Sequence, residues 1–84
     1  MSYWVYILSC KDNTLYTGIT DDIKKRLLLH NLGKGAKYTR GRAPLILVYK
    51  EEIPNRSAAL KREIEIKKMS REKKLALLNM NNYI

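Results

Sequence analysis

Two predicted helices carry charged side chains within their apolar faces. In the segment 22–31, Arg26 and His30 fall between apolar positions when the residues are projected at about 100° each. Glu63 has the same placement in the next predicted helix. Inward-facing charges are costly unless they are paired, bind a metal ion or line a wet cleft. A guanidinium, an imidazole and a carboxylate can together bind phosphate, transfer protons and hold a metal ion, so these residues are candidates for chemistry.

The same residues also fit an ordinary structural role. Asp22 with Arg26, and Glu63 with Lys67, are spaced four residues apart, as in common helix-stabilising ion pairs. A lone histidine on an apolar face, such as His30, is more often a hydrogen-bonded core residue than a base or a ligand. The recurrence of the pattern in two helices of one small basic chain favours the functional interpretation.

Two tyrosines in predicted strands are further candidates. Tyr6 lies in the segment 3–9 and Tyr16 in the segment 15–19. Their side chains share one face of a hairpin only if the connecting loop has an odd number of residues, as a loop at 12–14 would have. The sequence therefore predicts an odd-length loop and two phenols on one face. Tyrosines in strands usually serve packing, which is the alternative interpretation.

The elements that would position these side chains begin with three strands. Residues 3–9 and 15–19 are rich in aromatic and β-branched side chains. A third strand, 45–49, follows Pro44, which strands tolerate at their first residue. The helix between the second and third strands requires a right-handed crossover, which is satisfied if those two strands are parallel. The first strand then lies between them, antiparallel to both.

Three helices complete the predicted order. The first spans 22–31, with Thr20 or Asp21 as its cap and Gly33 just past its end; the second runs from a cap at 55 or 57 to about 69; the third starts after Ser70. The predicted fold is α+β, a three-stranded antiparallel sheet with a central first strand, flanked by helices in the order β-β-α-β-α-α. The apolar character of both faces of residues 3–9 fits a sheet covered on both sides.

A basic loop is predicted at 33–42, where three glycines interrupt any regular structure. Such a loop is expected to be mobile and to meet a ligand. The predicted nucleic-acid contacts are Lys34, Lys37, Tyr38, Arg40 and Arg42.

The composition points to a polyanion as the partner. The 84 residues contain 17 lysines and arginines against 8 acidic residues, a net charge of +9. Nucleic acid is favoured over a membrane, because the apolar runs 27–29 and 45–48 are far too short to span a bilayer. The start of the chain lacks the features of a secretion signal, and the single Cys10 has no zinc or disulfide partner, so a cytoplasmic location is expected.

Two triplets carry a resemblance to a known family. Val5-Tyr6-Ile7 and Tyr16-Thr17-Gly18 stand where the GIY-YIG nuclease superfamily has its two defining triplets. The chain is similar in particular to a small stand-alone bacterial subgroup, and the resemblance covers nearly all of a single domain, 1–84. It continues at further positions along the chain: Arg26, His30-Asn31, Gly35-Ala36-Lys37-Tyr38-Thr39-Arg40, Arg62-Glu63 and Lys67.

The resemblance implies a role for each candidate. Glu63 would be the single protein ligand of one Mg²⁺ or Mn²⁺ ion, and Arg26 would hold the scissile phosphate. Tyr6 would activate the attacking water, supported by Tyr16 and His30. An unperturbed phenol, with a pKa near 10, is a poor base at neutral pH, so its surroundings would have to assist it.

The implied function is a metal-dependent endonuclease that hydrolyses phosphodiester bonds of DNA. Several relatives carry lysine where this chain has Ile19, which bears on proton relay. Sequence specificity is not expected, because larger relatives obtain it from appended domains, and a protein partner could supply it instead. The alternatives are a catalytically weak or silent nucleic-acid-binding module and a protein-binding adaptor.

Overall fold

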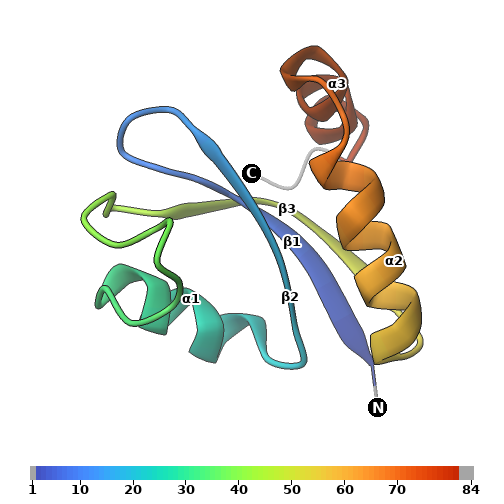
Figure 1. Cartoon of the computed structure of the whole chain (residues 1–84), viewed down its shortest axis with the longest axis horizontal. Coiled ribbons are helices and arrows are strands. Elements are labelled where there is room, and N and C mark those ends of the chain that lie inside the picture. Colours follow the sequence, from blue (N-terminus) through green and yellow to red (C-terminus); the bar gives the residue numbers. More distant parts are fainter. Residues whose placement is uncertain (1, 82–84) are drawn as a thin grey trace.

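The computed structural model describes residues 2–81, which form one α+β domain (Figure 1). The ends of the predicted domain, residue 1 and residues 82–84, lie outside the described residues. The fold class and the order of elements predicted from the sequence are confirmed. The elements are β1 (Tyr3–Ser9), β2 (Leu15–Thr20), α1 (Ile23–Asn31), β3 (Ile46–Ile53), α2 (Arg56–Lys67) and α3 (Arg71–Asn81).

The sheet has the predicted topology. Its order is β2-β1-β3, with β1 central and antiparallel to both neighbours. Ser9 pairs with Leu15, so five residues, an odd number, connect the two strands of the hairpin. Tyr16 stands opposite Leu8, which lies two residues from Tyr6 on the same strand. Tyr6 and Tyr16 therefore face the same side of the sheet, as predicted.

Both faces of β1 are covered, which explains why this strand is apolar throughout. Val5 and Ile7 are fully buried in a core cluster under α2, together with Ala59 and Ile66. On the other face, a second cluster packs against α1 (Figure 1). Its buried members are Tyr6, Leu8, Cys10 and Leu45. Tyr6 thus belongs to the packing on the α1 side of the sheet.

The structure corrects several predicted boundaries. β3 begins at Ile46 and continues to Ile53, four residues beyond the predicted end at 49. The three residues 50–52 are all charged, so the apolar run ends before this edge strand does, and Val5 pairs with Glu51 there. α1 is capped by Asp22, whose side chain accepts a hydrogen bond from the Lys25 backbone N–H.

The second and third helices also depart from their predicted limits. Asn55 caps α2 by accepting a hydrogen bond from the Ala58 backbone N–H. The helix ends at Lys67, before the predicted end at 69. α3 starts at Arg71, and Ser70 accepts a hydrogen bond from the Lys73 backbone N–H. The helix that carries Glu63 is therefore stabilised at its first turn by a side-chain cap.

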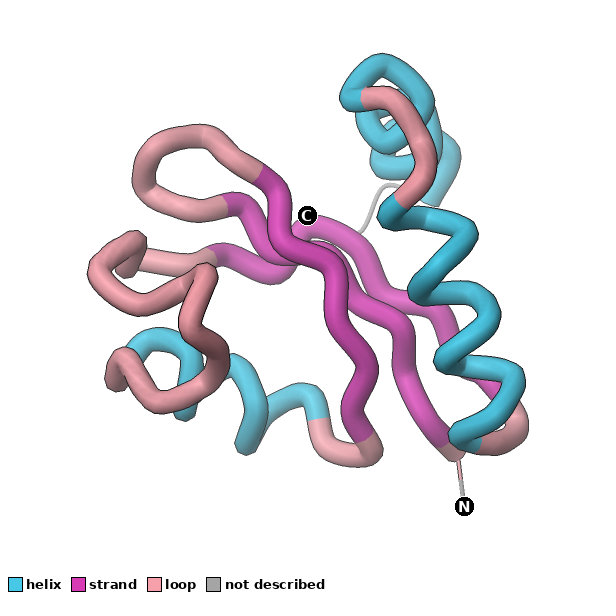
Figure 2. The backbone as a smooth tube through the Cα atoms, in the orientation of Figure 1, coloured by secondary structure: helices cyan, strands magenta, loops and turns pink. Residues whose placement is uncertain are grey.

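The basic loop lacks helix and strand, as predicted, but it is anchored at several points. The Lys11 backbone N–H donates to the Arg42 carbonyl oxygen at 2.9 Å, and the side chains of Asp12 and Arg42 form an ion pair. Thr39, in the middle of the loop, is fully buried. Figure 2 shows the hairpin loop and the basic loop next to each other at one end of the sheet. The expected freely exposed loop is thus attached to the body of the protein.

Within residues 2–81, no helix has the length and apolar character needed to cross a bilayer.

Candidate active site

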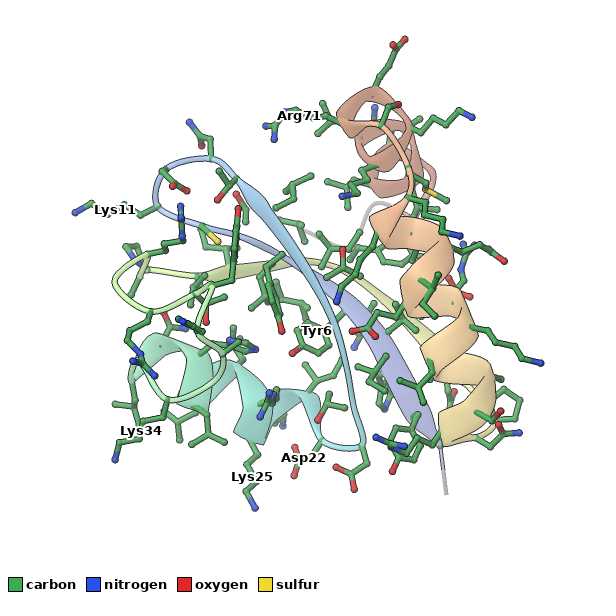
Figure 3. The ribbon with its side chains drawn as sticks, in the orientation of Figure 1. Tyr6, Lys11, Asp22, Lys25, Lys34 and Arg71 are labelled. Atoms are coloured by element: carbon green, nitrogen blue, oxygen red, sulfur yellow. The ribbon has the colours of Figure 1, made fainter. Side chains whose placement is uncertain are left out.

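The site is organised around the phenol of Tyr6, which points across the neighbouring strand. Tyr6 pairs with Gly18 of β2, and a Cβ atom at Gly18 would lie 2.7 Å from the Tyr6 hydroxyl and 2.8 Å from its Cζ. Only glycine leaves room for the ring at this position. Because β2 is an edge strand, the phenol reaches the rim of the sheet, between α1 and α2 (Figure 3).

A hydrogen-bonded chain runs from Tyr6 into the basic loop. The Tyr6 hydroxyl oxygen lies 2.8 Å from Nε2 of His30, and Nδ1 of His30 lies 2.8 Å from Oγ1 of Thr39. His30 and Thr39 are fully buried, and Tyr6 is 2% exposed. Burial lowers the pKa of His30, and the nearby charge of Arg26 lowers it further. The imidazole is therefore held in its neutral form at neutral pH.

Arg26 combines one internal hydrogen bond with an unused donor. Its Nη2 donates to the carbonyl oxygen of Gly35 at 2.8 Å. Its Nε is buried and has no hydrogen-bond partner within the described residues. A buried guanidinium donor without a partner is costly, and an anion such as a phosphate oxygen would satisfy it. The predicted Asp22–Arg26 ion pair is not what fixes this side chain, because Asp22 instead caps the helix.

Glu63 approaches the same phenol from the opposite helix. Its side chain is 17% exposed and forms an ion pair with Lys67 at 3.3 Å, the structural role that the sequence also predicted. Burial raises the pKa of Tyr6 to about 12, and the carboxylate of Glu63 adds to this rise. The Arg26 guanidinium interacts with the phenol and acts in the other direction. Arg26 and Glu63 are therefore both close enough to Tyr6 to perturb it.

Aromatic rings extend the site toward solvent. Tyr16 packs edge-on against His30, with ring centroids 5.1 Å apart, and Tyr38 stacks on Tyr16 at 5.9 Å. The guanidinium carbon of Arg42 lies 4.5 Å from the Tyr38 ring centroid. Tyr38 and Arg42 thus form the outer layers of a stack whose inner layer is His30.

The remaining predicted nucleic-acid contacts point outward. Lys34, Lys37 and Arg40 are exposed, and Figure 3 shows Lys34 directed away from the body of the protein. They lie on the same loop that contacts His30 and Arg26 from within. The loop therefore presents cations on its outside and structural contacts on its inside.

The surface around the site has two hollows. A groove of about 320 Å³ runs beside the stacked tyrosines, and its lining is Leu15, Tyr16, Thr17, Tyr38, Lys67 and Lys74. Arg26 borders a separate hollow of about 270 Å³ near the start of α1.

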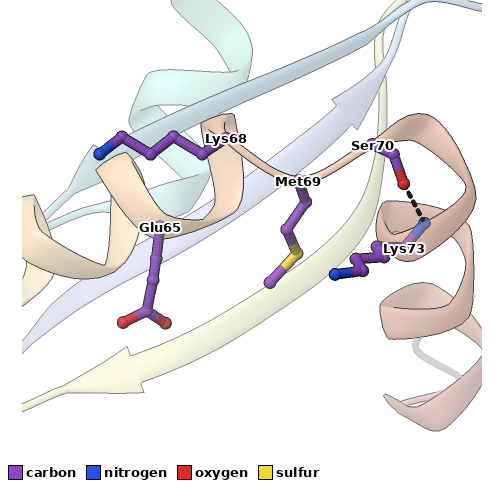
Figure 4. A pocket seen from close by; sticks show the side chains of 5 residues that line it. All are labelled: Glu65, Lys68, Met69, Ser70 and Lys73. Carbon is purple, nitrogen blue, oxygen red and sulfur yellow. Dashed lines mark hydrogen bonds between the residues drawn. The ribbon is translucent and has the colours of Figure 1, made fainter.

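A larger hollow lies at the α2–α3 junction and does not involve the candidate residues. It measures about 430 Å³ and is lined by Glu65, Lys68, Met69, Ser70 and Lys73 (Figure 4). Ser70 acts there as the cap of α3.

The donor set fits a singly ligated hard cation. Among residues 2–81, no group of three or more histidine, cysteine, aspartate or glutamate side chains could enclose a metal ion. Glu63 is one partly exposed carboxylate, and both it and Arg26 act on the Tyr6 phenol; a single carboxylate suits a magnesium-type ion completed by water and phosphate oxygens.

The structure thus gathers Tyr6, Tyr16, Arg26 and His30 around one point, with Glu63 close enough to perturb its phenol. The sequence interpretation did not single out Thr39, which is the end of the hydrogen-bonded chain. The only signal in the sequence was a small polar residue between Tyr38 and Arg40 of the loop, and its burial depends on how the loop folds.

Comparisons with known proteins place these features in a family. Residues 2–76 match the GIY-YIG catalytic domain. A UPF0213 protein from Staphylococcus haemolyticus is 51% identical over 76 residues, which is 90% of this chain and 93% of the relative. Another from Syntrophus aciditrophicus is 57% identical over 79 residues, 93% of this chain and 91% of that protein.

Two solved structures are similar throughout the chain. The solution NMR structure of a UPF0213 protein from Bacillus halodurans has a TM-score of 0.63 and 48% identity, and covers 95% of this chain and 85% of that one. A second solution NMR structure, of a protein from E. faecalis, has a TM-score of 0.67 and 38% identity, and covers 100% and 90%.

Proposed function

Because the chain belongs to the GIY-YIG catalytic domain family, we propose that it is a metal-dependent endonuclease that hydrolyses phosphodiester bonds of DNA. The family is of the nuclease type and acts on nucleic acid, generally with a divalent metal ion. The observation that carries the proposal is the convergence on the Tyr6 phenol. A neutral imidazole contacts it, and a guanidinium and a carboxylate perturb it from the two helices.

Arg26 is the phosphate-binding group of the proposed reaction. Its unsatisfied Nε would donate to a non-bridging phosphate oxygen while Nη2 stays bound to Gly35. A guanidinium presents its donors in a rigid planar fork, so it can follow the growing negative charge of the transition state. Anchoring by the loop carbonyl keeps that fork in place before the substrate arrives.

Tyr6 is the proposed acceptor of the proton of the attacking water. A phenol with a pKa near 12 cannot ionise spontaneously at neutral pH, so it needs a partner that takes its proton. His30 lies at hydrogen-bonding distance and is neutral, which fits that partner. Tyr16 packs against the imidazole and restricts its orientation.

Glu63 is the proposed metal ligand. The ion would supply positive charge at the phosphate and at the leaving 3′ oxygen. Burial is the main cause of the raised pKa of Tyr6 and the Glu63 carboxylate adds a smaller contribution, which a cation that neutralises the carboxylate would remove. Lys67, which pairs with Glu63, would move aside or bind an adjacent phosphate.

The substrate would be held by backbone contacts. The anchored loop presents three exposed cations, Lys34, Lys37 and Arg40. Such side chains bind the phosphates of the DNA backbone and carry no information about the base sequence. Tyr38 and Arg42 add an aromatic and cationic surface next to the groove. Selectivity for the form of the DNA rather than for its sequence is the expected result.

The proposal is tested by incubating the protein with single-stranded, duplex and branched DNA in Mg²⁺ or Mn²⁺, with a chelator control. Metal-dependent nicking of at least one substrate is expected. DNA binding with steep salt dependence, together with an absence of nicking in either metal, would instead support the silent binding module.

A further inference from the structure

The orientation of His30 depends on a residue outside the set of charged and aromatic candidates. Nδ1 of His30 contacts Oγ1 of Thr39, and Oγ1 of Thr39 donates to the carbonyl oxygen of Ala36 at 3.1 Å. A carbonyl oxygen can only accept, so we assign the single hydroxyl proton of Thr39 to it. Oγ1 is therefore left as an acceptor toward the imidazole.

This assignment fixes the protons of the whole chain. Since Oγ1 of Thr39 accepts, Nδ1 of His30 must carry the proton. In a neutral imidazole Nε2 then has the lone pair, and the Tyr6 hydroxyl donates to it. Each group in the chain therefore donates its proton to the next, from Tyr6 through His30 and Thr39 to the backbone carbonyl of Ala36.

We propose that Thr39 is a positioning residue that holds His30 in the Nδ1-protonated tautomer, so that Nε2 can take the proton of Tyr6. The inference rests on the proposed nuclease function for its catalytic meaning, while the tautomer itself is a property of the folded protein. Thr39 touches neither the phosphate nor the reacting water in this assignment.

The proton balance of the step is simple. The O–H bond of Tyr6 breaks as a bond to Nε2 of His30 forms, and the phenol oxygen regains a proton from the attacking water. The imidazole then carries protons on both nitrogens, and the water becomes the hydroxide that attacks phosphorus. Oγ1 of Thr39 accepts from Nδ1 both before and after the transfer, so no group has to rotate.

Three features make Thr39 the fixed end of this chain. Its side chain is fully buried, so no bulk water replaces the hydroxyl. Its carbonyl oxygen accepts from the Arg42 backbone N–H at 3.1 Å, which holds the turn. Gly35 brings the loop against the ring, because a Cβ there would lie 2.3 Å from Nδ1 of His30.

The loop therefore has two tasks that its composition alone does not reveal. Its cations face solvent, while Thr39 and the Gly35 carbonyl hold His30 and Arg26 from the inside. The same ten-residue loop, 33–42, therefore carries both the proposed substrate contacts and the group that orients the proton acceptor.

The test compares wild type with Thr39→Val and Thr39→Ser by nitrogen-correlated NMR of the imidazole. The chain has one histidine, so its ring signals need no assignment among several. Wild type and Thr39→Ser are expected to show protonated Nδ1. Thr39→Val, which keeps the shape but lacks the acceptor, is expected to lose this preference.

Activity gives the second readout. Thr39→Val should lower kcat by about 10- to 100-fold with KM nearly unchanged, and Thr39→Ser should restore most of it. An Nε2-protonated wild type, or a folded Thr39→Val variant with unchanged tautomer and kcat, would overturn the inference. Because the tautomers of the wild type and of both variants are measured without substrate, a failure of the nuclease proposal leaves the NMR comparison decisive for Thr39.

Discussion

In the proposed reaction the Tyr6 phenol exchanges a proton at neutral pH, which requires neighbouring groups that change its pKa and accept its proton. Burial raises the pKa of Tyr6, with smaller contributions from Tyr16 and Glu63, whereas the interaction with Arg26 opposes that rise. His30 offers an acceptor that stays neutral because burial and Arg26 disfavour its charged form. Ile19 packs on the α2 side of the sheet, so in the proposed reaction the proton relay falls to the histidine.

Replacement of Arg26 separates turnover from affinity. Arg26→Ala should lower kcat by about 10²- to 10³-fold, because its donors strengthen their bonds as charge develops on the phosphate. DNA affinity should change by less than about tenfold. Lys25→Ala, the neighbouring exposed cation on α1, is the matched control and should leave kcat unchanged. Equal losses of turnover and affinity in single-turnover kinetics would refute this role.

The histidine predicts how stability and activity respond to acid. In the unfolded chain His30 titrates near its usual pKa of about 6.5, and in the folded protein the pKa is lower. Between these two values the unfolded state binds more protons, so the free energy of unfolding falls as the pH drops through this window. Cleavage should be lost at the lower, folded pKa.

An NMR titration of the single histidine measures this shift directly, alongside thermal unfolding at several pH values. A folded pKa at or above about 6.5 would contradict a buried, neutral imidazole next to Arg26. Replacing Arg26 with alanine should raise the His30 pKa, because a neighbouring positive charge is removed.

At the scale of elements, the site depends on an edge strand that lets a side chain pass over it. β2 is the outer strand, and its Gly18 lies beneath the ring of Tyr6. α1 supplies Arg26 and His30 one turn apart, and α2 supplies Glu63 from the other side of the sheet. The three-residue pattern Tyr-Thr-Gly thus has a steric meaning, because the glycine makes room for the phenol of the paired strand.

Gly18→Ala tests this steric account. The added methyl group would lie 2.7 Å from the Tyr6 hydroxyl, so the ring must move away from His30 or the strands must separate. A loss of about 1–3 kcal/mol in the free energy of unfolding is expected, with a fall in kcat. Thr20→Ala on the same strand adds no atoms and should preserve the position of the ring. Denaturant unfolding and the NMR signals of Tyr6 measure both effects, and an unshifted ring with full activity would disprove the account.

At the scale of the whole molecule, the net charge is +9, but some of the cationic side chains are already paired with carboxylates. Part of it is consumed internally: Arg42 pairs with Asp12, Arg62 with Glu51 and Glu65, and Lys67 with Glu63. The exposed cations of the basic loop are among those that remain for a polyanion. Binding should therefore depend steeply on salt, although fewer cations contribute than the composition suggests.

Neutralisation of individual cations tests whether the unpaired cations of the loop contribute more to DNA binding than the paired ones. Lys34→Gln, Lys37→Gln and Arg40→Gln should each weaken DNA binding across sequences and lower the salt slope by up to about one unit. Arg42→Gln should change the slope less, because its charge already has a carboxylate partner. Lys61→Gln, on an exposed part of α2, is the control. A uniform effect of all five substitutions would favour a diffuse charge effect over a loop-centred one.

The sequence predicted those features that follow from the number of residues in a loop and from the rules of strand connection. Loop parity placed Tyr6 and Tyr16 on one face, and the crossover rule made the first strand central. What it could not predict depends on contacts between distant residues. Arg42 meets Asp12 thirty positions away, and this ion pair turns an expected mobile loop into an anchored one. The burial of Thr39 depends on how that loop folds back over His30.

The most direct test of the account is a paired measurement of cleavage and binding for wild type and Glu63→Ala. The wild type should cleave DNA in Mg²⁺ or Mn²⁺ and lose this activity with a chelator. Glu63→Ala should bind DNA as tightly or slightly more tightly, and should not cleave, because a carboxylate near a phosphate helps only when a cation bridges them. Glu65→Ala, an exposed carboxylate on the same helix, should behave as wild type. If Glu63→Ala cleaves at the wild-type rate, or if the wild type binds without cleaving in either metal, the central claim is wrong.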